Sequence, residues 1–395
     1  MTNAAFTAHG TPAGRLPRRY WSWRLVVPLE AAAGMTVGVL VVFVGSGDRE
    51  PMAGSSGVTG VASAHLGMVA GTVWVANEDG ASLSAIDTAS NTVVTTVEGV
   101  KGPHNVQVSP NGKSVWAVSG HDSLAVMFDA SSLQLHGVAA TGGAPAHVVL
   151  TPDGRTTYTT NGADNTVTAI DSVTMAPMAE IPVGAGPHGL RPSPDGRRVV
   201  VANVAGSTLT FIDTASNTKV ADVEVGKAPA QVAFSPDGAF VYTSVSGEDD
   251  VVKVDVATLR VLGRVAVGDG PIQTFATADD RYLLVANQGR EDRPGLTVSV
   301  IDTTTFTVVP TVETGQGAHG IVVDPTSLHA YVTNLYGDAV AVIDLGELRV
   351  VARIPVGDKP NGISFSSVTV PAQEAVMLDV PASDDGAEPN EHVAH

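Results

Sequence analysis

An aspartate recurs at nearly constant intervals along most of this chain of 395 residues. The repeated residues are Asp87, Asp129, Asp171, Asp213, Asp255, Asp302 and Asp344. They lie 42 residues apart, except for one step of 47. A second marker keeps the same phase: Pro103, Pro145, Pro187, Pro229, Pro271, Ala318 in place of a proline, and Pro360. A period of this length indicates a repeat architecture with seven copies of one unit.

Each copy contains four short runs of β-forming residues. In the copy that ends near Thr151, the expected strands are Ser114–Ser119, Ser123–Phe128, Leu133–Ala139 and His147–Leu150. Valine, isoleucine and alanine dominate them with partial alternation, as half-buried strands require. Four strands in each of seven copies predict an all-β fold, a seven-bladed β-propeller with four antiparallel strands per blade, over residues 72–366.

The two ends of the repeat region are complementary. The chain enters at Thr72 with the second strand of a blade and leaves at Asn361–Ser366 with the first strand of a blade. We expect these two strands to pair, because an open ring would expose its sheet edges.

The repeated aspartate opens a turn in every copy. Asp87-Thr-Ala-Ser-Asn-Thr92 and Asp213-Thr-Ala-Ser-Asn-Thr218 are identical turns whose aspartate can accept hydrogen bonds from nearby backbone amides. A residue present seven times in the same turn is best explained by structure. We therefore assign these aspartates a structural role.

Residues before the repeats carry the pattern of a membrane or export segment. Residues 1–24 contain Arg15, Arg18, Arg19 and Arg24 and no acidic residue, and residues 25–45 are mostly apolar. This pattern predicts a cytoplasmic amino terminus, then an N-terminal transmembrane helix or signal segment, with residues 46–71 as a linker. An uncleaved anchor and a cleaved signal both place the propeller outside the cytoplasm, tethered or secreted.

The charge of the chain limits its partners. Of its 22 basic residues four precede the apolar segment, so the rest of the chain carries 18 basic against 40 acidic residues. Such a surface repels phosphate backbones, and nucleic acid is therefore excluded as a partner. We expect a monomer that binds a cation, a small molecule or a protein. Residues 367–395 contain six acidic residues and no lysine or arginine, and predict a disordered tail.

Several segments resemble a known repeat family. Tyr331-Val332-Thr333-Asn334 is the YVTN signature itself, and Val75-Ala76-Asn77, Val201-Ala202-Asn203 and Val285-Ala286-Asn287 are variants of it. Over residues 72–366 the chain thus resembles the YVTN-type β-propellers. This resemblance implies the fold and leaves the function open among surface-layer and periplasmic binding propellers, lactonase-like propellers and haem d1 propellers.

The residues after each repeat proline are expected to begin the innermost strands and to ring the channel mouth. Four histidines occur in these places: His104, His147, His188 and His319. Neutral imidazoles that converge on one point suit divalent transition metals, and one of them could bind haem iron. The alternatives are general acid–base catalysis, or a structural role in which the histidines bond turn amides and interblade carbonyls.

Neutral and basic side chains are expected at the same mouth. They are Asn105, His121, Gln231, Gln273, Arg290, Arg293 and Asn361. Arg290 and Arg293 belong to the segment Gln288–Gly295, whose five extra residues account for the step of 47. Insertions in repeat proteins often lie on the binding face, so these arginines could attract an anionic group.

No catalytic motif accompanies these residues. The chain has no cysteine, and no His-Glu-x-x-His, Gly-x-Ser-x-Gly or phosphate-loop pattern occurs in it. We therefore expect an extracytoplasmic binding or scaffolding module whose ligand lies at the channel mouth. The alternatives are a metal-dependent lactonase- or lyase-like enzyme and a haem- or metal-handling propeller.

Overall fold

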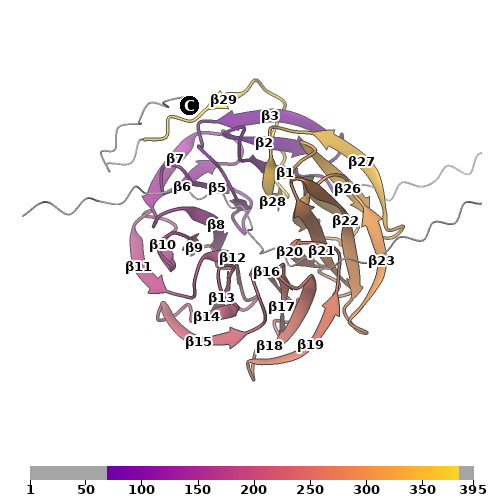
Figure 1. The fold of residues 1–395 in the computed structure, drawn as a ribbon. Coiled ribbons are helices and arrows are strands. Elements are labelled where there is room, and N and C mark those ends of the chain that lie inside the picture. The colour runs from indigo at the N-terminus through magenta and orange to yellow at the C-terminus, as the bar shows by residue number, and fades with distance from the viewer. Residues whose placement is uncertain (1–68, 382–395) are drawn as a thin grey trace, which may run out of the picture. The chain divides into compact units, whose positions relative to one another are not determined.

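The computed structural model describes residues 69–381, which form a ring of seven β-sheets (Figure 1). In six of them four antiparallel strands follow one another in chain order from the axis outward. These sheets are β4 (Val106–Val108), β5 (Ser114–Ser119), β6 (Leu124–Asp129), β7 (Leu135–Ala140); β8 (Pro145–Leu150), β9 (Thr156–Asn161), β10 (Thr166–Asp171), β11 (Pro177–Pro182); β12 (Pro187–Pro192), β13 (Arg198–Asn203), β14 (Thr208–Asp213), β15 (Thr218–Glu224); β16 (Pro229–Phe234), β17 (Phe240–Val245), β18 (Asp250–Asp255), β19 (Arg260–Ala266); β20 (Pro271–Ala276), β21 (Tyr282–Arg290), β22 (Arg293–Asp302), β23 (Thr307–Glu313); and β24 (Ala318–Val323), β25 (His329–Asn334), β26 (Ala339–Asp344), β27 (Arg349–Pro355).

The seventh sheet joins the two ends of the repeat region. Its strands are β28 (Pro360–Ser366), β1 (Thr72–Asn77), β2 (Ser82–Asp87), β3 (Thr92–Glu98) and β29 (Val376–Met377). β28 pairs antiparallel with β1, and Thr72 lies opposite Ser366 (Figure 1). The predicted seven-bladed propeller and its closure by Asn361–Ser366 are confirmed.

The repeated aspartates fix the outer turns. In each of the seven blades the carboxylate accepts a backbone N–H from the residue three positions later, as in the pairs Asp171–Thr174 at 2.7 Å and Asp344–Glu347 at 2.8 Å. These hydrogen bonds close the turn between the third and fourth strands. The structural role predicted for the aspartates is confirmed.

The core lies between neighbouring blades. Val, Ala, Ile and Leu side chains from adjacent sheets form most of it, and Trp74, Trp116, Tyr158, Tyr242 and Tyr331 are the largest fully buried side chains. Because each blade packs on both neighbours, the inner strands are held at fixed positions around the axis.

The five-residue insertion is part of a sheet. β21 and β22 continue as a longer hairpin in which Arg290 lies opposite Arg293. The extra residues therefore extend a blade, where the sequence predicted a loop.

The prediction of a disordered tail from residue 367 is wrong for residues 367–381. β29 pairs parallel with β3, and Leu378 N donates to the carbonyl oxygen of Glu98 at 2.9 Å (Figure 1). Val370 and Leu378 are buried in the cluster that contains Val97. The acidic composition did not reveal these few apolar residues, whose burial offsets the cost of ordering the segment. Residues 382–395 lie outside the described part.

The expected amino-terminal helix also lies outside the described residues. Residues 1–24, 25–45 and most of the linker 46–71 precede residue 69. Among residues 69–381 no helix is long and apolar enough to cross a membrane.

Adjacent tail residues allow a matched test of tail docking. Replacing Leu378, which is buried, with alanine should lower the free energy of unfolding by about 2 kcal/mol, the low end for such a truncation because the segment is peripheral. Met377→Ala should change it by less than about 0.5 kcal/mol, since its side chain is exposed. Equal effects in urea denaturation would contradict the docking of this segment.

Candidate metal centre

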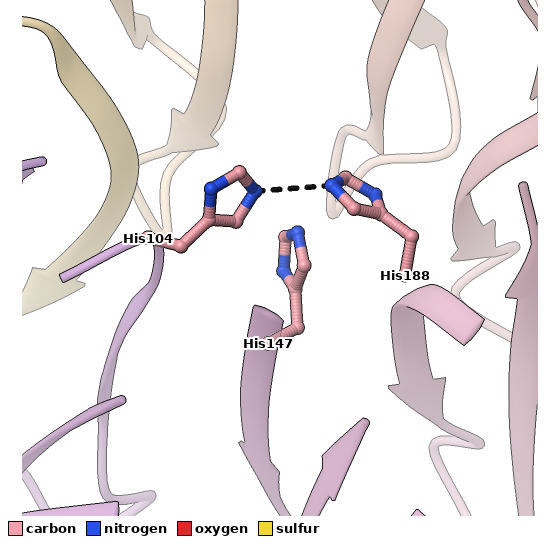
Figure 2. Close-up of side chains that lie close together, drawn as sticks. All are labelled: His104, His147 and His188. Carbon is pink, nitrogen blue, oxygen red and sulfur yellow. Dashed lines mark hydrogen bonds between the residues drawn. The ribbon is translucent and has the colours of Figure 1, made fainter. Parts of the chain in front are cut away.

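Three histidines meet where the innermost strands of three consecutive blades begin. His104 lies just before β4, His147 is the third residue of β8, and His188 is the second residue of β12. All three side chains are buried. In Figure 2 the ring of His147 points between the rings of His104 and His188. The repeat proline phases these positions, so the 42-residue period brings the imidazoles together.

The imidazoles are in direct contact. His104 Nε2 and His188 Nε2 are 3.0 Å apart (Figure 2), and the ring centroids are separated by 4.8–5.4 Å in edge-to-face pairs. One nitrogen from each of the three rings lies within 4.8 Å of the other two. This is the strongest convergence of metal-ligating atoms that the described residues contain.

Hydrogen bonds to the nitrogens that face away from the cluster determine which nitrogen of His188 and of His104 is protonated. His188 Nδ1 lies 2.9 Å from the carbonyl oxygen of Ala230, so this nitrogen carries the proton. In the neutral ring His188 Nε2 then has a lone pair, and His104 Nε2–H donates to it. His104 Nδ1 in turn accepts from Asn361 Nδ2 at 2.9 Å.

The third imidazole has an unsatisfied nitrogen. His147 Nε2 is buried and has no hydrogen-bond partner among the described residues. Its Nδ1 has a weak contact with Gln231 Nε2 at 3.4 Å. A buried polar atom without a partner is costly, and an ion between the three rings would satisfy it.

Burial keeps His147 and His188 neutral. It lowers the pKa of His188 from 6.5 to about 3, with a further contribution from His104, and it lowers the pKa of His147 well below the usual value. Neutral imidazole is the form that binds metals.

A carboxylate that the sequence analysis missed stands beside this cluster. Glu78 Oε2 lies 2.7 Å from Asn361 Nδ2 and 3.4 Å from His104 Nδ1. Burial acts to raise the pKa of Glu78, but the neighbouring His104 and the hydrogen bond from Asn361 Nδ2 outweigh it and lower the pKa to about 2. Glu78 follows β1 directly. Among the residues that follow the second strand of each blade, Glu78 and Gln288 are the two with long polar side chains. This comparison of the copies could have identified both residues from the sequence.

The fourth histidine stands apart from the other three. The ring centroid of His319 is 6.0 Å from that of His104, and its Nδ1 hydrogen bonds to Gln288 Oε1 at 2.9 Å. It is absent from the group whose nitrogen atoms converge. The structure thus brings together three of the four histidines named from the sequence.

The other predicted mouth residues divide into two groups. Asn361 and Gln231 contact the histidines, whereas Asn105 Oδ1 accepts from Val148 N at 3.3 Å and Gln273 Nε2 donates to the carbonyl oxygen of Ile321 at 2.9 Å. Asn105 and Gln273 therefore link neighbouring inner strands.

The remaining three predicted residues are His121, Arg290 and Arg293. His121 is exposed and lies against Gly102, and Arg293 pairs with Asp269 at 2.7 Å. Within residues 69–381 no hydrogen bond or ion pair joins His121, Arg290 or Arg293 to the three histidines.

Comparisons with known proteins support the fold. The model of the YNCE-like β-propeller family matches residues 122–370, more than half of the chain. Kuenenia stuttgartiensis hydrazine synthase is similar in structure, with a TM-score of 0.62, 23% identity, and coverage of 67% of this chain and 90% of that one. A functionally unknown protein from Desulfotomaculum acetoxidans gives 0.66, 15% identity, and coverage of 75% and 99%.

A third similar structure is the dihydro-haem d1 dehydrogenase NirN in complex with DHE. It has a TM-score of 0.56 and 15% identity, and the match covers 74% of each chain. At these identities the three structures show a shared propeller fold alone. No curated protein matches the chain at a significant level.

Stability should depend on pH through the buried imidazoles. In the unfolded chain histidines take up protons below pH 6.5, whereas the pKa of folded His188 and of folded His319 is about 3. The stability present above pH 6.5 should therefore decline as the pH falls from 6.5 toward 3. Urea denaturation of metal-free protein at pH 7.5, 6 and 5 measures this decline.

Two variants control this measurement. His188→Asn should make the decline shallower, because one buried titrating group is removed, while His136→Asn, on the exposed face of β7, should leave it unchanged. A free energy of unfolding that stays constant from pH 7.5 to 5 would contradict the neutral buried state.

Proposed function

The chain belongs to the YNCE-like β-propeller family, and we propose that it is an extracytoplasmic, membrane-tethered binding module that holds one divalent transition metal ion at the three histidines. The observation that carries the proposal is the convergence of His104, His147 and His188, with one of the converging nitrogens buried and unsatisfied. The repeat does not require histidine there, since Ala146 and Ala230 occupy equivalent places.

The distances favour an ion as small as Zn²⁺. Tetrahedral ligands about 2.0–2.1 Å from zinc are separated from one another by about 3.3 Å. His104 Nε2 and His188 Nε2 are already 3.0 Å apart, and the largest separation in the group is 4.8 Å. A small rotation of one ring would complete the site.

Surrounding groups resemble the outer shell of known metal sites. Ala230 O fixes His188 Nδ1, and Glu78 lies beside His104 Nδ1. When a metal takes His104 Nε2, the proton of that ring moves to Nδ1, where Glu78 can accept it. Carboxylates and carbonyls in these places then orient the ring and make the coordinating nitrogen more basic. The imidazoles favour Zn²⁺, Cu²⁺ or Ni²⁺ over the oxygen-seeking Mg²⁺ and Ca²⁺.

The other two functions considered have weaker support. A lactonase-like site for a hard ion needs several converging oxygen ligands. Here Glu78 is the carboxylate beside the histidines, and it already accepts a hydrogen bond from Asn361. A haem iron needs an imidazole that faces open space, but His104 Nε2 and His188 Nε2 face each other. The NirN complex therefore supplies a shared fold and no site for this chain.

Location outside the cytoplasm rests on the amino-terminal sequence. Four arginines precede the apolar residues 25–45, an arrangement that keeps the amino terminus inside and places the repeats outside. The acidic remainder of the chain suits a module that attracts cations from its surroundings.

Metal binding can be tested by titration of the purified, metal-stripped protein with Zn²⁺ in a competition assay against a chromophoric chelator. We expect one ion per chain. His147→Ala should weaken binding by about 100-fold or more, and Glu78→Gln by about 10- to 100-fold, because outer-shell changes have effects of that size.

The control is His136→Ala, which removes an exposed histidine of β7 and should leave the affinity unchanged. Circular dichroism of each variant shows whether the propeller is intact. No measurable ion in the unmodified protein, or an equal loss in the His136 variant, would contradict the proposal.

Topology can be tested by treating intact spheroplasts with a protease. The propeller should be digested while a cytoplasmic marker protein survives, because the repeats lie outside in this proposal. Full protection of the repeats would contradict it. Mass spectrometry of the amino terminus then separates a retained anchor from a cleaved signal.

A further inference from the structure

The seven inner strands also surround a cavity that the three histidines do not line. Its volume is about 390 Å³, within the usual size range of small-molecule sites. Every inner strand contributes at least one lining residue, and seven of these residues lie at positions separated by the repeat period. Three of these seven residues are polar: Gln107 of β4, Arg191 of β12 and Ser364 of β28.

Arg191 is the one charged residue among those that line the cavity. Its Nη1 donates to Gln107 Oε1 at 3.2 Å, and its guanidinium carbon lies 5.9 Å from the ring centre of Phe275. No carboxylate within residues 69–381 forms an ion pair with it. A guanidinium has five N–H donors, so most of them have no protein partner in the described structure.

Within the described part of the chain, Arg191 has no acidic partner, although the protein is strongly acidic. The chain has 40 acidic residues, and other arginines, such as Arg198 and Arg264, pair with them. Arg191 is partly buried, and burial of a cation without a counter-charge is costly; here burial lowers its pKa to about 10. A bound anion would offset this cost.

Gln107 is held in place beside the guanidinium. Its Nε2 donates to the carbonyl oxygen of Val108 at 3.2 Å and to Ser364 Oγ at 3.3 Å, so its Oε1 faces Arg191. Ser364 Oγ also accepts from Val108 N at 3.0 Å. These contacts hold the Gln107 side chain, whose Oε1 accepts from one nitrogen of the Arg191 guanidinium.

The rest of the lining is apolar. Val149, Phe234, Phe275, Val322 and Phe365 are among the residues around the cavity. An inorganic anion would leave this surface without a partner, whereas a carboxylate with a hydrocarbon or aromatic body would cover it. The planar guanidinium also matches a carboxylate through two parallel hydrogen bonds.

We propose that this cavity binds a small organic carboxylate, with its carboxylate on Arg191 and its apolar body against the phenylalanines. The site shares no residue with the histidine cluster, and carboxylate binding does not require the metal. Binding alone is proposed, because Ser364, the hydroxyl among the lining residues, contacts Gln107 and the Val108 amide and has no general base beside it there.

The test uses isothermal titration of the purified full chain with benzoate and hexanoate as probes. Benzamide and hexanol keep the apolar body and remove the charge, and inorganic phosphate keeps a charge and removes the body. We expect saturable binding of one carboxylate per chain, with the neutral analogues and phosphate at least about tenfold weaker.

Substitutions then locate the site. Arg191→Met should weaken carboxylate binding by about 10- to 100-fold, which is the effect of losing charged hydrogen bonds, and Arg191→Lys should retain part of it. Arg155→Met is the matched control, since that arginine is exposed in a turn, and it should have no effect.

Thermal unfolding separates this role from a structural one. If Arg191 binds a ligand and has no structural role, Arg191→Met should keep or raise the melting temperature, because a partly buried charge without an acidic partner in the described residues is removed. Absence of carboxylate binding, tighter binding of phosphate, or undiminished binding by folded Arg191→Met would overturn the proposal. Zinc affinity, measured on the same variant, reports separately on the histidine site.

Discussion

Pairing of β28 with β1 is the constraint on which the rest of the structure depends. It removes the two free sheet edges that an open ring of blades would leave and fixes seven inner strands around one axis. The closing strand also supplies both candidate sites: Asn361 hydrogen bonds to His104, and Ser364 lies beside Gln107 in the cavity. Glu78 directly follows the partner strand β1. Without closure, neither site would be complete.

The repeat period explains how much of the fold could be predicted. A residue at the same phase in every copy has the same place in every blade, so Asp87 and its six equivalents identify turns and Asn77 identifies a strand end. The structure gives the signature asparagine a physical role: Asn77 Nδ2 donates to Ser82 Oγ at 3.1 Å and Ser84 Oγ at 3.0 Å across the next strand. The signature is therefore informative about the scaffold and says little about a ligand.

The candidate sites were harder to predict, because they depend on how neighbouring elements meet. His104, His147 and His188 share nearly the same phase and could be grouped from the sequence, but the separation of His319 follows from its hydrogen bond with Gln288. Glu78 follows the second strand of its blade, whereas His104 precedes the first strand of the next blade. Their contact could therefore be recognised only from the three-dimensional structure. Arg191 does share a phase with Gln107 and Ser364. Reading the inner strands beyond their first two positions would have shown a single charged residue among neutral ones.

The two sites are linked by electrostatics. The charge of Arg191 contributes to lowering the pKa of His147, after burial and the neighbouring imidazoles, so its field reaches the cluster. A field that disfavours a proton on this ring also disfavours a metal cation beside it, because both place positive charge at the same location. An anion on Arg191 would reduce that repulsion. By linkage, a metal ion at the histidines would then favour the anion by the same free energy. Two occupied sites would therefore be coupled through their charges, without a change of shape.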